Sequence, residues 1–301
     1  MKLVESVPNF SEGRRENIVK EILAEAEKYS RVKILDWSMD FDHNRSVVTL
    51  VGEPEEIEKA IFDMAKKAVE LIDLRDHKGE HPRMGAVDVI PFIPVMNIDM
   101  KECIEISRRV GKRIAEELNL PVYLYEKSAT SSERENLANI RKGEFEGFFE
   151  KIKNPKWKPD FGPDKVHPTA GVVAVGAREY LIAFNVNLGT KNIEIANKIA
   201  KAVRHISGGF RYVKAIGVEL KEKGMVQVSM NLTNYKKSPI FRVFETIKRE
   251  AARYGVPVIN SEIIGMIPLK AAINTMMWYL QLDDFDESRV IENKILNTFF
   301  E

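Results

Sequence analysis

R-D-H-K-G-E-H-P-R-M-G-A-V-D-V-I-P-F-I-P-V, residues 75–95, joins a loop rich in ionisable side chains to an apolar run. The apolar run predicts a buried strand, and apolar residues at three- and four-residue spacing predict a helix before it, over 54–74. His81 precedes a proline, which disfavours helical backbone, and Gly79 and Gly85 allow conformations that other residues resist. A solvated surface loop is the simpler interpretation, but such a loop rarely needs this control. The stretch therefore predicts a loop held between two rigid elements, where chemistry is often carried.

Composition limits the classes of protein to which the chain can belong. Its 301 residues suit two domains, and 44% apolar with 30% charged residues is an ordinary globular composition. The net charge of +1 gives no overall attraction to nucleic acid or acidic membranes. The single cysteine, Cys103, excludes an intramolecular disulfide and a cysteine-rich metal site. Without a signal-peptide pattern or a membrane-spanning run, the expected location is cytoplasmic.

The order of predicted elements indicates the fold class. Strand and helix patterns follow one another as β-α-β-β-α-β over residues 3–95, and the same order recurs over 181–259. This is the order of ferredoxin-like folds. We therefore predict an α+β protein (an α/β sandwich) of two ferredoxin-like subdomains, residues 1–178 and 179–301. Residues 151–168, rich in Lys, Pro, Gly and Asp, are predicted to be an irregular connection.

Several longer motifs identify a family. The motifs that carry the resemblance are V-P-N-F-S-E-G at 7–13, N-R-S-V at 44–47, H-K-G-E-H-P-R-M-G-A-V-D at 77–88, P-D-F-G-P at 159–163, G-A-R-E-Y-L-I-A-F-N-V-N-L at 176–188, Q-V-S-M-N-L at 227–232 and P-L-K-A at 268–271. In this order they closely resemble the formiminotransferase domain of formiminotransferase-cyclodeaminase and its single-domain relatives, over nearly the whole chain. The cyclodeaminase part is expected to be absent.

The resemblance implies an activity. It implies transfer of a formimino group from N-formimino-L-glutamate to N5 of tetrahydrofolate, giving 5-formiminotetrahydrofolate and L-glutamate. Tetrahydrofolate is then the cosubstrate, and a homodimer is the expected assembly. The family's catalytic base is the histidine of the H-P-R-M-G motif, which corresponds to His81. Its folate-binding segment corresponds to Gly162, Pro163, Asp164, Lys165, Val166, His167, Pro168, Thr169, Ala170 and Gly171.

The chemistry of the residues fits this activity. N5 must lose a proton as it attacks and the departing glutamate nitrogen must gain one, and a histidine, whose ordinary pKa is about 6.5, can do both. Both substrates carry carboxylates, which guanidinium and ammonium groups bind. The candidates for binding anions or orienting the base are Arg45, His77, Glu80, Arg83, Asp40 and Arg178. Candidates beside the folate segment or for the pterin are Lys156, Lys158, Phe161, Asn185 and Asn187.

Two points leave roles open. Bifunctional relatives carry Asp-x-Asp where this chain has Asp36-Trp37-Ser38, so the function of a second carboxylate there is open, although Asp40 follows two residues later. His77 and His81 have the i, i+4 spacing of helical metal ligands, but Gly79 and Pro82 disfavour a helix between them. No metal is therefore expected.

Three alternatives remain at this stage. A related one-carbon enzyme could transfer a formyl group to or from glutamate, or handle 5-formyltetrahydrofolate. A non-catalytic folate-binding protein is disfavoured by the intact His-Pro-Arg sequence. RNA binding by tandem βαββαβ units is disfavoured because the strand predicted over 46–51 lacks the exposed aromatics that such domains use.

Overall fold

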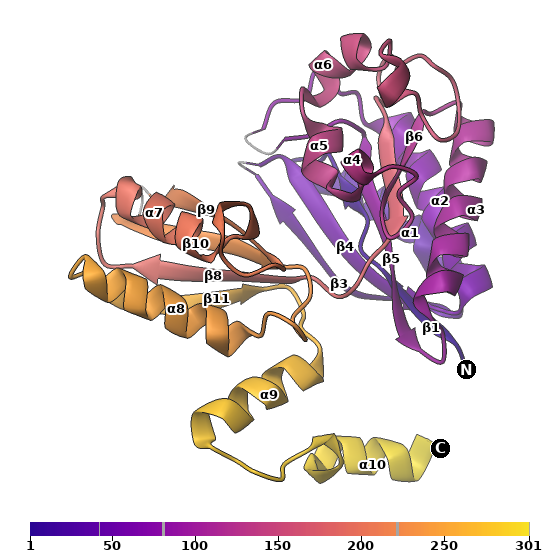
Figure 1. The fold of residues 1–301 in the computed structure, drawn as a ribbon. Helices are drawn as coiled ribbons and strands as arrows, with labels where there is room; N and C mark the ends of the chain where they lie inside the picture. Colours follow the sequence, from indigo (N-terminus) through magenta and orange to yellow (C-terminus); the bar gives the residue numbers. More distant parts are fainter. Residues whose placement is uncertain (42, 80–81, 221–222, 301) are drawn as a thin grey trace. The chain divides into compact units, whose positions relative to one another are not determined.

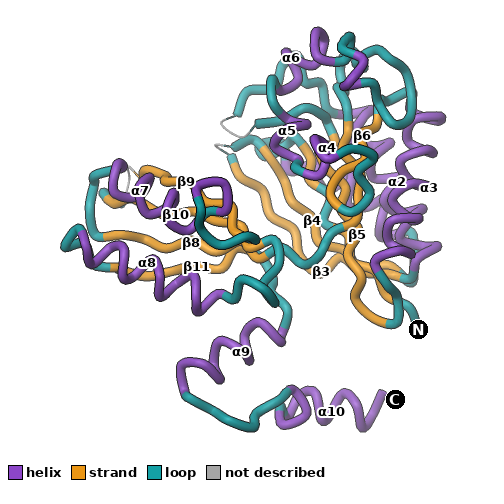
Figure 2. Tube along the Cα trace, in the orientation of Figure 1, coloured by secondary structure: helices purple, strands orange, loops and turns teal. Residues whose placement is uncertain are grey.

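The computed structural model describes residues 1–41, 43–79, 82–220 and 223–300 (Figure 1). The chain divides into two compact units, Met1–Arg178 and Glu179–Glu301, which are described separately below. Each unit contains one sheet, seven-stranded in the first and four-stranded in the second. Figure 2 shows the helices and strands of each unit. The predicted α+β class is confirmed.

The first unit is built on a β-α-β-β-α-β frame. Its helices are α1 (Glu16–Glu27), α2 (Pro54–Leu71) and α3 (Met100–Leu118), and its strands are β1 (Leu3–Ser6), β2 (Asn9–Phe10), β3 (Val32–Asp40), β4 (Arg45–Gly52), β5 (Val87–Met96), β6 (Val122–Glu126) and β7 (Val173–Ala177). Both β1 and β2 pair with β4 on one side and β5 on the other. They therefore act as one interrupted strand, and the order β5, β1/β2, β4, β3 is the fourth-first-third-second order of a ferredoxin-like sheet.

Two parallel strands extend this sheet. β7 pairs with β5 and with β6, both in parallel. The connection from β6 to β7 contains α4 (Ser132–Glu135), α5 (Leu137–Arg141), α6 (Glu144–Lys151) and the 3-10 turn η1 (Pro155–Trp157). The helices α4 and α5 are separate, because Asn136 takes an extended conformation and caps the second. The predicted irregular connection contains only η1 and isolated bridges between residues 152 and 172.

The strands of the first unit place different side chains on the two faces of the sheet. Along β4 the alternation is regular: Ser46, Val48 and Leu50 are buried on the face that α1–α3 cover, and the residues between them are half-buried (Figure 1). These half-buried residues belong to the other face of the sheet, opposite α1–α3, which is called the second face below. Neighbouring strands continue it. By strand alternation and pairing its side chains include Asp36, Ser38 and Asp40 of β3, Arg45, Val47, Thr49 and Val51 of β4, and Glu5, Asn9 and Ile93.

The second unit repeats the frame without the extension. Its elements are β8 (Ile182–Leu188), α7 (Ile193–Val203), β9 (Val213–Leu220), β10 (Met225–Leu232), α8 (Ile240–Arg253) and β11 (Val258–Ile264), followed by α9 (Leu269–Leu280) and α10 (Ile291–Phe300). The antiparallel order is β11-β8-β10-β9, again fourth-first-third-second. The apolar residues Ile182, Phe184 and Val186 are buried in its core. The helix α7 ends at Val203, and His205 begins a 3-10 turn after it.

Glycines allow backbone segments of the first unit to approach closely. Gly85 and Gly171 form an isolated antiparallel bridge, and a Cβ added at Gly85 would lie 2.1 Å from the carbonyl oxygen of Val172. Because that atom belongs to the backbone of a buried strand connection, it cannot move aside as a flexible side chain could. The contact explains why the loop before β5 contains a glycine at this point.

Replacing Gly85 by alanine is therefore expected to lower the free energy of unfolding by about 1–3 kcal/mol, the usual cost of overpacking. Gly147 is a matched control, because it lies in α6 with no atom within 4 Å of an added Cβ. Gly147→Ala is expected to raise stability by about 0.5–1 kcal/mol through helix propensity. Urea titration measures both values. Equal effects of the two substitutions would contradict the steric argument.

Candidate functional site

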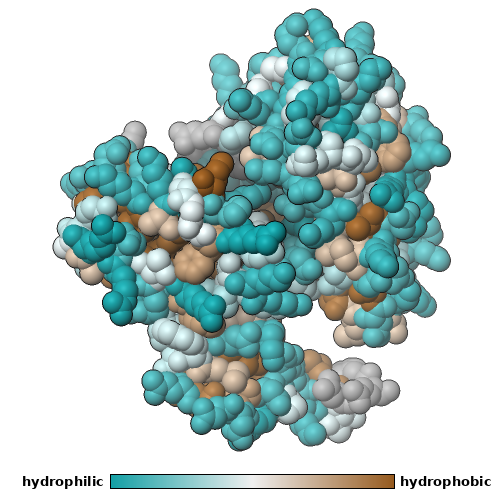
Figure 3. All heavy atoms as spheres, in the orientation of Figure 1, coloured by the Kyte–Doolittle hydropathy of each residue, from teal (hydrophilic) through white to brown (hydrophobic). Residues whose placement is uncertain are grey.

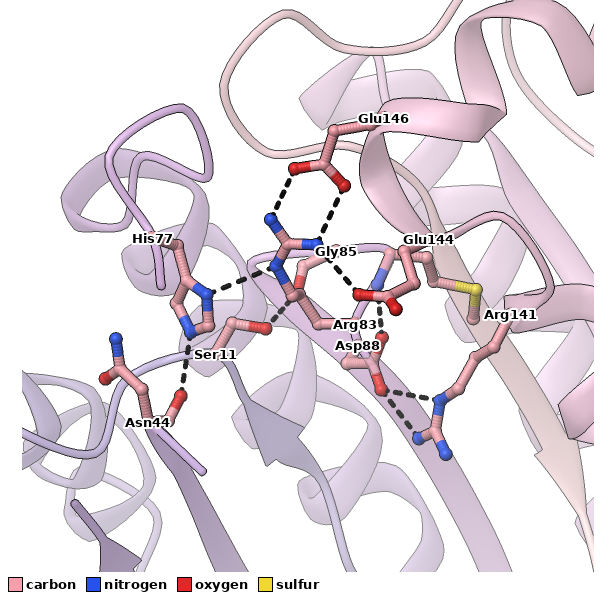
Figure 4. A network of polar contacts seen from close by, with 10 residues as sticks. Ser11, Asn44, His77, Arg83, Gly85, Asp88, Arg141, Glu144 and Glu146 are labelled. Carbon is pink, nitrogen blue, oxygen red and sulfur yellow. Dashed lines mark hydrogen bonds and ion pairs between the residues drawn. The ribbon is translucent and has the colours of Figure 1, made fainter. Parts of the chain in front are cut away.

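The loop before β5 and the segment 162–171 lie side by side in the first unit. Leu74 donates its backbone N–H to the carbonyl of Thr169, and Ala86 donates to that of Ala170. The same loop is fixed on its other side by Ser11, whose hydroxyl donates to the carbonyl of Gly85 at 2.7 Å (Figure 4). The structure thus brings together two segments that are far apart in the sequence. His81 and Glu80, which were predicted as base and carboxylate, lie outside the described residues.

His77 is a buried, fully engaged histidine of this loop. Its Nε2 lies 2.8 Å from the carbonyl oxygen of Asn44, and its Nδ1 accepts a hydrogen bond from Nε of Arg83 at 3.2 Å. Nε2 therefore carries the proton, and the ring is a neutral donor and acceptor. Burial lowers the pKa of His77, and the charge of Arg83 lowers it further, against the hydrogen bond to Asn44, which raises it. This geometry gives His77 an orienting function and leaves neither nitrogen for proton transfer to a ligand.

Arg83 links the loop to the N-terminal turn of α6. Its guanidinium binds Glu146 through two hydrogen bonds of 2.9 and 2.6 Å and Glu144 through a third of 3.0 Å (Figure 4). The hydrogen bond from Arg83 lowers the pKa of Glu146. Arg83 thus makes four hydrogen bonds, to His77, Glu144 and Glu146. His77, Arg83 and Glu146 form a hydrogen-bonded chain whose first two members lie on either side of position 81 in the sequence.

Asp88, near the start of β5, interacts with two arginines. It accepts a hydrogen bond from the backbone N–H of Met84 at 2.8 Å and binds Arg141 through Nε at 2.9 Å and Nη2 at 2.6 Å (Figure 4). Nη1 of Arg45 lies 3.9 Å from the same carboxylate, and Nε of Arg45 donates to Asn9 at 2.9 Å. Burial, followed by the charge of Arg141, lowers the pKa of Arg45 to about 9. Two guanidinium groups therefore share one carboxylate, beside the second face of the sheet.

The segment 162–171 has two kinds of side chain. Val166 and Ala170 are buried in the hydrophobic core, so their side chains cannot contact a ligand in this structure. His167 folds back on its own turn, where Nδ1 accepts the backbone N–H of Ala170 at 3.0 Å, and burial lowers its pKa. Gly171 is also buried. The other predicted residues of the segment are half-buried or exposed: Gly162, Pro163, Asp164, Lys165, Pro168 and Thr169.

Stability is expected to fall as the pH drops below about 6.5, the ordinary pKa of histidine. The folded-state pKa values of His77 and His167 are lowered, so the unfolded chain takes up protons at a higher pH than the folded one. The free energy of unfolding therefore decreases as the pH falls through the unfolded value. Melting temperatures at pH 7.5 and 5.5 should show a smaller decrease for His77→Gln and His167→Gln than for the wild type. An unchanged decrease in both variants would contradict this assignment.

The other predicted residues lie in varied surroundings. Asp40 ends β3 and binds the ring of His43 at 2.9 Å. Arg178 follows β7, where its backbone N–H donates to Phe92. Phe161 is packed against the core, so it is not an exposed wall for a flat ring. Four other candidates have protein partners: Lys156 binds Glu133, Lys158 binds Asp164, and Asn185 and Asn187 of the second unit bind Glu262 and Asn260.

Comparison with known proteins identifies the family. Residues 3–178 match the model of the formiminotransferase domain, N-terminal subdomain, and residues 183–297 match that of the formiminotransferase domain. The chain belongs to the formiminotransferase family. It is 53% identical to a protein named glutamate formimidoyltransferase from Streptococcus pyogenes serotype M1, over 98% of this chain and 99% of that protein. A protein of the same name from Thermoplasma acidophilum is 50% identical, over 98% of each.

The relationship extends to longer proteins. The formimidoyltransferase-cyclodeaminase of Rattus norvegicus is 40% identical over 98% of this chain, but the match covers only 56% of that protein. The chain thus corresponds to about half of the bifunctional formiminotransferase relatives. The resemblance that the motifs predicted is confirmed by these matches.

Sequence reasoning missed several residues of this formiminotransferase site. Asp88, Arg141, Glu144 and Glu146 were not predicted, although the first lies inside the quoted H-K-G-E-H-P-R-M-G-A-V-D motif. No local signal distinguishes these charged residues from solvated ones, because their partners lie 53 to 63 residues away in the chain. Figure 3 shows that hydrophilic side chains cover most of the α4–α6 region from which three of them come.

Among the described residues no group of three or more His, Cys, Asp and Glu side chains is arranged to hold a metal ion. Within the same described residues no helix of this formiminotransferase is both long and apolar enough to cross a membrane.

Proposed function

We propose that this chain transfers the formimino group of N-formimino-L-glutamate to N5 of tetrahydrofolate, giving 5-formiminotetrahydrofolate and L-glutamate. The observation that carries the proposal is 53% identity, over 98% of the chain, to a protein named glutamate formimidoyltransferase. The matches to the two formiminotransferase models, over 3–178 and 183–297, also support it. Tetrahydrofolate is then a cosubstrate, and no step of the proposed reaction uses a metal.

His81 is proposed as the base of this reaction. N5 attacks the formimino carbon and forms a C–N bond, while its proton passes to the imidazole. The tetrahedral intermediate then expels the glutamate nitrogen, which takes that proton from the imidazolium. One histidine thus serves as base and then acid, and no net proton is gained or lost by the enzyme.

The described residues around His81 are proposed to hold it in position. His77 and Arg83 lie four residues before it and two residues after it, and both are fixed by hydrogen bonds to Asn44 and Glu146. Asp88 anchors the far end of the loop through the N–H of Met84. A loop fixed at these points limits the positions that the intervening histidine can reach, which is the usual requirement for a precise catalytic group.

Substrate carboxylates are proposed to bind near Arg45 and Arg141. Their side chains are 15% and 16% exposed, and both guanidinium groups lie at the carboxylate of Asp88. Arg83 is a weaker candidate for this function than the sequence indicated, because Glu144 and Glu146 occupy it. Glu80, Asp40 and Arg178 stay proposals for balancing charge or orienting a substrate.

A transfer assay tests the proposed function. L-glutamate release from N-formimino-L-glutamate is measured with and without tetrahydrofolate, and N-formyl-L-glutamate is the competing donor. Release that requires tetrahydrofolate and the formimino donor supports the proposal. Release from the formyl donor alone would favour the related one-carbon reaction, and tight folate binding without any release would favour a binding protein.

Assembly and location follow the family in this proposal. A homodimer in the cytoplasm is proposed, with no nucleic acid or membrane partner. Light scattering on the purified protein measures its mass in solution, and a mass of one chain at micromolar concentration would contradict the dimer.

A further inference from the structure

Glu5 carries a buried carboxylate oxygen for which the described residues supply no hydrogen bond. It lies on β1, and its Oε2 is buried with no hydrogen-bond partner among the described residues. Buried carboxylates are costly unless they are paired or hydrogen-bonded, and each unsatisfied one in a folded protein requires an explanation. Burial raises the pKa of Glu5, and the charge of Arg178 offsets part of that rise.

Apolar side chains and one cation lie around Glu5. The side chain lies on the second face of the sheet, between Val51 of β4 and Ile93 of β5, its cross-strand partners. These two apolar side chains are half-buried and buried respectively. Arg178 hydrogen-bonds the hydroxyl of Tyr125 as well as lying near Glu5. The carboxylate thus has apolar neighbours on both sides and one cation nearby, and its Oε2 has no donor among the residues that the structure describes.

The same face leads from Glu5 to the candidate active site. Asn9 lies four residues further along the same interrupted strand. It binds Arg45, one of the two arginines at the carboxylate of Asp88. At the usual rise per strand residue, Glu5 and Asn9 are about 13 Å apart. This distance is long enough for a pterin ring and the one-carbon group next to it. One ligand can therefore contact Glu5 while a second substrate contacts Arg45 and Arg141.

We propose that Glu5 binds the donor edge of the pterin, with its carboxylate accepting hydrogen bonds from N3–H and the exocyclic 2-amino group. This inference rests on the proposed function, because it supposes that a reduced folate is the acceptor. The chemistry is specific: two parallel N–H donors on a planar edge match the two oxygens of a carboxylate, as in guanidinium–carboxylate pairs. Val51, which is half-buried, then contacts the ring, and the other end of the pterin points toward Asn9 and Arg45.

Glu5→Gln is the variant that tests the inference. The amide keeps the size of the carboxylate but replaces one acceptor by a donor, which opposes the 2-amino group. The dissociation constant for tetrahydrofolate, measured by calorimetry under anaerobic conditions, is expected to rise about 10- to 100-fold, the usual value of hydrogen bonds to a charged group. The melting temperature without ligand should not fall, because the substitution removes an unsatisfied buried charge. Glu27→Gln, at an exposed carboxylate of α1, is the control and should match the wild type.

A pterin analogue without the 2-amino group separates recognition from a structural effect. It should bind the wild type and Glu5→Gln with nearly equal affinity. Unchanged affinity of Glu5→Gln for tetrahydrofolate overturns the inference, as does a loss that is equally large for the analogue. A different result would show that the proposed function is wrong. In that case the wild type binds tetrahydrofolate or its analogue but releases no glutamate from the formimino donor.

Discussion

Asp160→Ala is expected to lower the free energy of unfolding by about 3–5 kcal/mol, the cost of removing one partner of a buried ion pair. Asp160 lies 2.6 Å from Nη1 of Arg134, and the two side chains are each only 8% exposed. Its carboxylate also accepts the backbone N–H of Leu124 at 2.8 Å and the hydroxyl of Thr130. The alanine variant leaves Arg134 buried without its counter-charge and the N–H of Leu124 without an acceptor.

This substitution also affects the site. Asp160 belongs to the P-D-F-G-P motif that leads into residues 162–171, and Arg134 binds the carbonyls of Lys156 and Lys158 just before it. Asp164→Ala is the matched control, because its ion pair with Lys158 is 57% and 62% exposed and is worth about 0–1 kcal/mol. Chemical denaturation of both variants gives the two values. A loss below about 1 kcal/mol for Asp160→Ala would show that the pair is not structurally important.

His81→Ala is expected to reduce kcat by about 10²–10⁴-fold, the usual contribution of one general base. The family motif assigns the base to this position, and the described residues on either side are fixed by hydrogen bonds. Because the hydrogen bonds of His77 to Asn44 and of Arg83 to Glu146 do not involve position 81, the variant should keep the wild-type melting temperature. The Michaelis constant for tetrahydrofolate should change little, since the pterin is held elsewhere.

His205→Ala is a suitable control, because His205 is exposed in a 3-10 turn of the second unit. It should have wild-type activity. If His81→Ala kept more than a third of the wild-type kcat, His81 would not be the base. The remaining histidine of the loop, His77, would then need a conformation different from the one seen here.

Much of the fold could be predicted because local patterns determine it. The alternation along β4 and the spacing in α2 each follow from which side chains must be buried, and both are visible in a short window of sequence. Short elements were harder to predict from the sequence. The two-residue strand β2 has no periodicity, and it exists only because β4 and β5 pair with it on both sides. The break at Asn136 depends on a capping side chain within an otherwise helical stretch.

Only the local part of the candidate site could be predicted from the sequence. The loop containing His77 and Gly85 could be found, because glycines, a proline and ionisable residues occur together there. The partners that give each residue its function could not be found, because they come from distant parts of the chain. Glu146 saturates Arg83 from α6, and Arg141 reaches Asp88 from the end of α5. Phe161 shows the opposite case, in which an aromatic suited to a pterin wall is packed against the core.

The central claim is that this chain moves a formimino group between two nitrogens by means of one histidine. The most direct measurement is a ¹³C NMR time course with donor labelled at the formimino carbon, with tetrahydrofolate, for wild type and His81→Ala. The account predicts that the label moves from the glutamate nitrogen to N5 with stoichiometric release of glutamate in the wild type, and about 10²-fold or more slowly in the variant. Label that stays on glutamate in the wild type, or moves equally fast in both proteins, would contradict it.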